Sequence, residues 1–263
     1  MKLAEKLLTC KSSGRKGLII YITAGYPDFD TTVQAVKAVE AAGADLVEIG
    51  LPFSDPLADG PIIQKASTEA LAAGATVDKT LELIKRLAKE TTIPLAIMTY
   101  YNIVLQYGIE KFTSDFAKDG ISGLILPDLP LEESAAVEPA CKQAGIDLIS
   151  FVAPTTTPER LKPICSQASG FIYCISNTGV TGVRQIDYNQ LAPLLADVRK
   201  ETSVPLAIGF GIGSPEAARE AAKHADAVIV GSAIVERLGK QGVAAVQEFT
   251  SILRQALDKG EQV

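Results

Sequence analysis

Two acidic side chains stand out in the stretch VEIGLPFSDPLADGP, residues 47–61. Glu48 lies between Val47 and Ile49 in an apolar run, and Asp59 follows eleven residues later. An ionised carboxylate is unfavourable in an apolar interior unless it is paired or used in chemistry. A carboxyl whose pKa is raised by such surroundings can exchange protons near neutral pH, so the pair predicts general acid–base catalysis. A structural Glu48, bonded only to backbone groups, is the alternative.

Two glycine-containing turns form a second candidate site. They are GFGIGSPE (209–216) and VGSAIV (230–235), and each lies where a predicted strand gives way to a helix. Glycine lets backbone N–H groups approach an anion, and a helix that begins near Ser232 adds its positive dipole end. We therefore expect Gly211, Gly231 and Ser232 to bind phosphate. Two plain tight turns, with Ser214 as a helix N-cap and Pro215 in the first helical turn, are the competing interpretation.

The run SNTGVTGVR, residues 176–184, follows the sixth predicted strand. Its small polar residues predict a loop that closes over a ligand, with Gly182 adding a further N–H to the phosphate. A plain surface loop is the alternative.

Other reactive side chains offer less. The four cysteines form no CxxC pair, and a single histidine, His224, does not allow the usual His/Cys zinc cluster, so we expect no metal. No lysine lies at a predicted strand end to form a Schiff base. Carboxylates and tyrosines remain, and Tyr21 and Tyr173 belong to the first and sixth predicted strands.

Eight short apolar runs alternate with helical segments and predict the elements that position these side chains. The runs are 17–23, 46–49, 94–98, 123–127, 147–152, 171–175, 205–209 and 227–231. Eight such units predict a (β/α)8 TIM barrel, since an open doubly wound sheet usually has fewer strands. We expect one domain, residues 1–263, with an extra N-terminal helix at Leu3–Thr9 and an extra helix in the second βα connection at Pro61–Ala73.

Barrel enzymes carry their chemistry at the carboxyl ends of the strands. In the run at 46–49, Leu46 and Glu48 share one face, while Val47 and Ile49 share the other. The outward face must be apolar to meet the helices. Glu48 is therefore expected to point into the barrel mouth, below the loop that carries Asp59.

Composition limits the partners. The chain has 263 residues, of which 47% are hydrophobic and 21% charged, as in an ordinary globular protein. Its net charge of −6 argues against nucleic acid and anionic membranes. The N-terminal stretch lacks a signal-peptide core, and no apolar run is long enough to span a bilayer. We expect a soluble cytoplasmic protein whose partner is a small molecule or another protein.

Six motifs together resemble the tryptophan synthase alpha subunit family, over essentially the whole chain. They are VEIGLPFSDPLADGPIIQ, MTYYNIVLQYG, LILPDLPLEES, ISNTGVTG, IGFGI and IVGSAIV. The resemblance implies a carbon–carbon lyase that cleaves indole-3-glycerol phosphate into indole and glyceraldehyde 3-phosphate in tryptophan biosynthesis. It also implies no cofactor on this chain, and a beta subunit that carries pyridoxal phosphate in an alpha2beta2 assembly.

The resemblance further implies roles for single residues. The catalytic group is Glu48, Asp59 and Tyr173. The substrate-binding group is Tyr21, Met98, Tyr100, Thr181, Gly182, Phe210, Gly211, Gly231 and Ser232. The interface with the partner is Pro52, Asp55, Tyr101, Asn102, Asp128 and Pro130. Two residues depart from the family pattern, because Tyr21 stands where phenylalanine is frequent and Asn177 where many members have arginine.

Two other functions are compatible with parts of this pattern. A stand-alone lyase that releases free indole from the same substrate would have a similar active site, and it would be fully active without a beta subunit. A non-catalytic barrel that binds a phosphate ligand and regulates a partner would have no use for a buried acid pair, so Glu48 and Asp59 argue against it.

Overall fold

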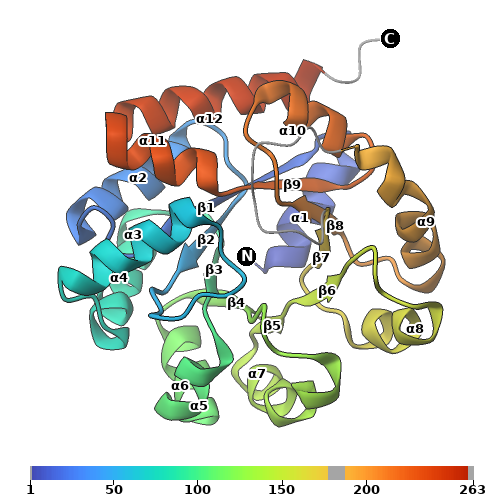
Figure 1. Cartoon of the computed structure of the whole chain (residues 1–263), viewed down its shortest axis with the longest axis horizontal. Helices are drawn as coiled ribbons and strands as arrows, with labels where there is room; N and C mark the ends of the chain where they lie inside the picture. The colour runs from blue at the N-terminus through green and yellow to red at the C-terminus, as the bar shows by residue number, and fades with distance from the viewer. Residues whose placement is uncertain (1, 177–186, 260–263) are drawn as a thin grey trace.

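In the computed structural model, which describes residues 2–176 and 187–259, parallel strands form a barrel ringed by helices (Figure 1). The strands are β1 (Gly17–Thr23), β2 (Leu46–Gly50), β3 (Leu95–Met98), β4 (Ile121–Ile125), β5 (Asp147–Leu148), β6 (Ser150–Val152), β7 (Ile172–Ile175), β8 (Leu206–Gly209) and β9 (Ala227–Val230). They are hydrogen-bonded in the order β5-β4-β3-β2-β1-β9-β8-β7-β6. The predicted barrel is confirmed.

The fifth predicted strand is divided into β5 and β6. Strand β5 pairs with β4, and β6 pairs with β7. The first half of this stretch is therefore hydrogen-bonded to one neighbour and the second half to the other. Ile149, between the two, donates its N–H to the Leu124 carbonyl at 2.9 Å. This change of partner brings the two ends of the sheet together, so the eight predicted strands appear as nine segments.

Helices cover the outside of the barrel. They are α1 (Leu3–Ser12), α2 (Phe29–Ala41), α3 (Pro61–Ala72), α4 (Val77–Glu90), α5 (Tyr101–Tyr107), α6 (Ile109–Lys118), α7 (Glu138–Ala144), α8 (Pro158–Gln167), α9 (Ala192–Glu201), α10 (Pro215–Ala222), α11 (Ser232–Gln241) and α12 (Val243–Asp258), with short 3₁₀ helices η1 (Leu131–Ala136) and η2 (Tyr188–Leu191). Both predicted extra helices are present as α1 and α3, with α1 running on to Ser12. None of the described helices is long and apolar enough to cross a membrane.

Local sequence explains several helix ends. The Asp28 carboxylate caps α2 by accepting from the Thr31 N–H at 2.7 Å, which satisfies one of the free donors of the first turn. Helix α7 ends at Gly145, whose φ of 74° lies in the left-handed region. Glycine adopts this conformation without steric cost, so it ends a helix readily.

Two apolar layers follow from the alternation of side chains along the strands. Val47 and Ile49 belong to the outer layer, between the strands and the helices. Leu46 belongs to the inner layer, which fills the barrel together with Leu3 and Leu7 of α1. Glu48 shares the inward face with Leu46, as the sequence predicts.

Helix α1 closes one end of the barrel by inserting two leucines. A Cβ on Gly123 would lie 2.3 Å from Leu3 Cδ1, and one on Gly17 would lie 2.7 Å from Leu7 Cδ2. Neither distance is compatible with a side chain, so these two strand glycines make room for the helix.

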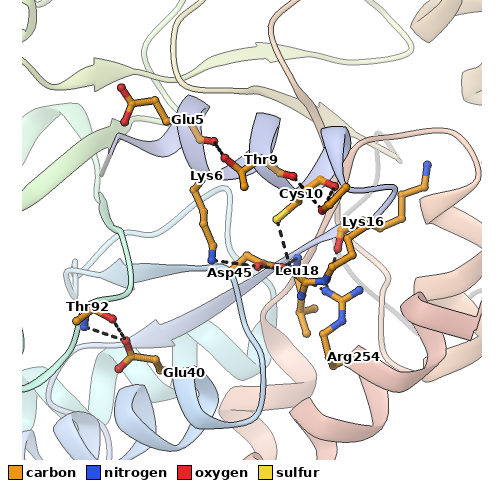
Figure 2. Close-up of polar contacts among 12 residues, drawn as sticks. Glu5, Lys6, Thr9, Cys10, Lys16, Leu18, Glu40, Asp45, Thr92 and Arg254 are labelled. Carbon is orange, nitrogen blue, oxygen red and sulfur yellow. Dashed lines mark hydrogen bonds and ion pairs between the residues drawn. The ribbon is translucent and has the colours of Figure 1, made fainter.

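Two aspartates at strand starts bind this end together. Asp45, 2% exposed, accepts from the Leu18 N–H at 3.0 Å and forms ion pairs with Lys6 (3.5 Å), Arg15 (3.4 Å) and Arg254 (3.2 Å). Figure 2 shows Lys6, Leu18 and Arg254 around it. Asp226 does the same before β9, where it accepts from the Leu206 N–H and pairs with Lys11 and Arg199. The opposite end of the barrel is left for the site.

Candidate active site

A cavity of about 760 Å³ lies at the carboxyl ends of the strands. This volume is in the range of small-molecule sites. The predicted site residues that line it are Tyr21, Glu48, Asp59, Met98, Tyr173, Phe210, Gly211, Gly231 and Ser232. Residues 177–186, which include Asn177, Thr181 and Gly182, lie outside the described part of the chain.

Glu48 occupies the centre of strand β2, between Tyr21 of β1 and Ala96 of β3 in the sheet register. It is 1% exposed, and its Oε1 has no hydrogen-bond partner in the described residues. Burial raises its pKa to about 8, because a charged carboxylate loses its hydration there. Its surroundings thus favour the protonated form. A structural role for Glu48 would require hydrogen bonds to backbone groups, and Oε1 makes none in the described residues.

Asp59 reaches the same cavity from the loop between β2 and α3, and it is 6% exposed. Burial raises its pKa to about 6, while a hydrogen bond from the Tyr100 hydroxyl acts in the opposite direction. At pH 7 Glu48 is therefore mainly protonated and Asp59 mainly ionised. Two carboxyls with separated pKa values can serve as an acid and as a stabilising charge in one reaction.

Tyr21 and Tyr173 each lie over a glycine of the next strand. A Cβ on Gly50 would lie 2.0 Å from the Tyr21 oxygen, and a Cβ on Gly209 would lie 2.3 Å from the Tyr173 oxygen. Burial raises the pKa of both phenols well above its usual value, so both stay neutral. These rings can pack against a flat apolar ligand.

An aromatic cluster continues from Tyr173. Its ring stacks on Phe151 at a centroid distance of 5.1 Å and meets Phe210 edge-on at 6.0 Å. Phe210 has a φ of 76°, the one positive value among the described non-glycine residues, and Gly211 follows with 72°. Such conformations are held by their surroundings, often at functional sites. Here the Ser176 hydroxyl donates to the Gly209 and Phe210 carbonyls, each at 3.0 Å.

The two glycine turns differ in how their helices begin. At α10 the Ser214 side chain accepts from the Ala217 N–H at 3.2 Å, as the tight-turn interpretation expects. At α11 Gly231 is the N-cap and gives no side-chain bond. A Cβ on Gly231 would make only ordinary contacts, 3.4 Å to Tyr21 Cβ and 3.6 Å to Ile63 Cδ1. Packing therefore does not require a glycine at position 231. Because Gly231 has no side chain, the N-terminus of α11 stays accessible to an anion.

Tyr100 is buried next to the Asp59 loop, where its hydroxyl accepts from the Ala58 N–H at 3.0 Å and its ring stacks on Phe53 at 5.1 Å. It therefore holds the loop. Tyr100 is not among the described residues that line the cavity, and its contact with the ligand stays a prediction.

The predicted partner interface follows β2, β3 and β4. Asp55, Asn102, Asp128 and Pro130 are exposed, Tyr101 is half-buried, and Pro52 is buried. The Asp128 carboxylate accepts from the Tyr101 N–H at 2.9 Å, at the start of α5.

Sequence reasoning missed three kinds of residue at this site. Ser176 supports the strained turn, Gln64 of α3 donates to the Asp59 carbonyl at 2.9 Å, and Gly50 and Gly209 make room for the tyrosines. The strand register could have indicated Gly50. Glu48 is the register partner of Tyr21, and Gly50, two residues further along β2, is the next position on the same face of the sheet, where the Tyr21 ring extends. No group of three or more His, Cys, Asp or Glu side chains in residues 2–176 and 187–259 could hold a metal ion.

Residues 7–261 match the model of the family described as tryptophan synthase alpha chain. The alpha chain of Thermosynechococcus vestitus is 46% identical over 260 residues, which cover 98% of each chain. The alpha chain of Synechococcus elongatus is 48% identical over 250 residues, 95% of this chain and 94% of that one. The tryptophan synthase alpha subunit of Legionella pneumophila superposes with a TM-score of 0.90 at 34% identity, over 98% of this chain and 99% of that one. A chain of Mycobacterium tuberculosis tryptophan synthase gives 0.90 at 36% identity, over 97% of each.

Proposed function

Since the chain belongs to the tryptophan synthase alpha chain family, we propose that it cleaves indole-3-glycerol phosphate into indole and glyceraldehyde 3-phosphate, with Glu48 and Asp59 as its catalytic carboxyls. It thereby serves tryptophan biosynthesis. The observation that carries the residue assignment is the buried Glu48, whose pKa of about 8 keeps a proton available beside an ionised Asp59.

The reaction breaks the bond between indole C3 and the glycerol side chain. Protonated Glu48 gives its proton to C3, and the ring nitrogen becomes positively charged. Ionised Asp59 stabilises that charge by accepting a hydrogen bond from the ring N–H. The C3 bond then breaks and its electrons restore the indole ring. The adjacent hydroxyl of the side chain becomes the aldehyde and returns a proton to Glu48, so the step is balanced without an oxidant or a cofactor.

Other cavity residues hold the substrate in this scheme. Tyr21, Met98 and Phe210 surround the indole, and Tyr173 lies beside the side chain that becomes the aldehyde. The phosphate binds at Gly211, Gly231 and Ser232, where the uncapped N-terminus of α11 supplies backbone N–H groups. Thr181 is proposed to contact Asp59 from the loop at 176–184, and Gly182 to add a backbone N–H to the phosphate. Fixing the phosphate orients the reacting bond between the two carboxyls.

The partner is a tryptophan synthase beta subunit in an alpha2beta2 assembly, and the beta subunit alone carries pyridoxal phosphate. The docking rim comprises the exposed residues Asp55, Asn102, Asp128 and Pro130, half-buried Tyr101 and buried Pro52. Leu57 on the same loop is 89% exposed, which is consistent with a surface that a partner covers. A biosynthetic enzyme of this family is expected in the cytoplasm.

The test is product formation by the purified chain. With indole-3-glycerol phosphate, and with a beta subunit but without serine, we expect equal amounts of indole and glyceraldehyde 3-phosphate. Absence of indole under both conditions, with and without the beta subunit, would refute the activity.

A further inference from the structure

From the contacts of the loop between β2 and α3, we infer that Gln64 of α3 is a positioning residue that holds Asp59 in its working orientation. Nothing in the proposed chemistry requires Gln64 to touch the substrate. The inference rests on the proposed function, because it assumes that Asp59 acts in catalysis.

The loop has little regular structure of its own to hold Asp59. Residues 51–60 contain no helix or strand, and a short turn is closed by the Asp59 N–H donating to the Pro56 carbonyl at 3.0 Å. Leu57 at the tip of this turn is almost fully exposed. A loop of this kind needs bonds to neighbouring elements to fix a side chain within it.

Gln64 supplies such bonds from α3. Its Nε2 donates to the Asp59 carbonyl at 2.9 Å and lies 3.5 Å from the Pro56 carbonyl. The same amide thus reaches both ends of the turn. Helix α3 is itself fixed, since Ala66 and Ala70 are buried against Tyr21 and Val235. Gln64 therefore ties the turn to a rigid part of the barrel.

Tyr100 holds the turn from another element. Its hydroxyl accepts from the Ala58 N–H at 3.0 Å, one residue before Asp59. The same hydroxyl also bonds the Asp59 carboxyl. With the backbone of residues 56, 58 and 59 bound as well, that carboxyl is held at the cavity wall. Among these bonds, those of Gln64 require a neutral amide donor, because a glutamate would place oxygen against the two carbonyl oxygens.

The position of Gln64 predicts a kinetic signature. Gln64→Leu keeps the side chain's approximate size but removes the donor, so the turn loosens and Asp59 is in place for less of the time. A misplaced catalytic group lowers the rate constant more than substrate affinity. We expect kcat to fall by about 10-fold, with KM within about 2-fold of the parent.

The experiment is a double-mutant cycle, measured as indole release by the complete alpha–beta complex. The four chains are the parent, Gln64→Leu, Asp59→Asn and the double variant. If Gln64 acts through Asp59, its substitution causes no further loss once Asp59 is an asparagine. Lys65→Met is the matched control, because Lys65 is the next residue of α3 and its only ion pair within residues 2–176 and 187–259 is with exposed Glu69, at 3.6 Å. It should leave kcat unchanged.

The pH profile provides an independent readout. Burial holds the pKa of Asp59 at about 6. A looser turn admits water, so in Gln64→Leu the acid limb of the kcat/KM profile should move to lower pH, while a general loss of stability would not move it.

The outcomes distinguish the positioning role of Gln64 from the catalytic role of Asp59. Parent-like kcat in Gln64→Leu overturns the positioning role, as does an equal fold loss in the Asp59→Asn background with an unmoved acid limb. If Asp59→Asn itself keeps the parent's kcat, the proposed role of Asp59 fails, and the role of Gln64 falls with it.

Discussion

Glu48 and Asp59 belong to one cavity, yet burial affects them differently. Glu48 is enclosed in the inner face of the barrel and its Oε1 finds no hydrogen-bond partner among the described residues, so its charged form is strongly disfavoured. Asp59 keeps the Tyr100 hydroxyl as a donor, and its pKa rises less. The two roles in the proposed mechanism follow from this difference, since the residue types alone are almost the same.

The pH dependence of indole release follows from these values. Asp59 must be ionised, so kcat/KM should rise as the pH increases through about 6. Glu48 must begin protonated, so kcat/KM should fall as the pH increases through about 8. The expected profile is a bell with its maximum near neutral pH. A profile that keeps rising to pH 10 would mean that Glu48 does not act as the acid.

Only part of the site could be predicted from single residues. The alternation in the run at 46–49 predicted that Glu48 points inward, because a strand has a strict period of two. Gln64 could not be found this way, since its bonds to Asp59 and Pro56 depend on where α3 begins and how the loop folds back. The bond between the Tyr100 hydroxyl and the Ala58 N–H could not be predicted either, because it joins two residues that lie 42 positions apart in the sequence.

At the scale of elements, the N-terminus of α11 is the proposed phosphate site. Gly231→Asp places a carboxylate where the anion binds, so KM for indole-3-glycerol phosphate should rise by at least about 10-fold through charge repulsion. Protection of the protein by glycerol phosphate against thermal unfolding should be lost as well.

Gly231→Ala is the control, because it adds a Cβ with ordinary contacts and no charge. It should have a smaller effect on KM. Undiminished protection of Gly231→Asp by glycerol phosphate would place the phosphate elsewhere.

The closed end of the barrel should govern stability and leave catalysis unaffected. Asp45→Asn removes the charge that faces buried Arg254, along with Lys6 and Arg15. Arg254 keeps Asp258, at 2.6 Å, as a second partner, so the loss of the Asp45 charge should lower the free energy of unfolding by roughly 1–3 kcal/mol. Denaturant unfolding would measure this loss, while kcat should stay near that of the parent.

Exposed Glu90 gives the comparison, because its carboxylate pairs at the surface with Lys37 and with Arg86, each at 2.9 Å. Glu90→Gln should leave the unfolding midpoint unchanged, because water screens such pairs. If both substitutions lowered the free energy of unfolding equally, the buried Asp45 would contribute no more to stability than an exposed ion pair.

The eight strand-forming runs and their order could be read from the sequence, and the division of the fifth run could not. The run at 147–152 has the composition of a single strand, and its pattern gives no sign of a break. The structure divides it into β5 and β6 because the two ends of the sheet meet there, and each half pairs with a different neighbour. Ring closure is a property of the whole barrel, so a local pattern cannot show it.

The whole molecule has two unlike ends. Helix α1 and its ion pairs close one end, and the cavity lies at the other, next to the exposed loops proposed to meet the beta subunit. Docking there covers the loop that carries Asp59, so it should reduce the loop's freedom and raise the rate. Indole would then leave toward the partner.

We therefore expect weak lyase activity from the chain alone and a rise of at least about 10-fold with a cognate beta subunit, which corresponds to about 1.4 kcal/mol in the barrier. Asp55→Lys, at the exposed rim, should abolish the activation and spare the basal rate. High activity that no beta subunit changes would favour the stand-alone indole-releasing lyase.

The central claim is that a buried, proton-bearing Glu48 performs the acid–base steps. The measurement that tests it most directly is kcat for indole release by Glu48→Gln in the alpha–beta complex at pH 7. The amide keeps the shape of the side chain and cannot exchange a proton, so kcat should fall by on the order of 10²-fold or more, while glycerol phosphate still protects the variant from unfolding. A kcat close to that of the parent would contradict the account.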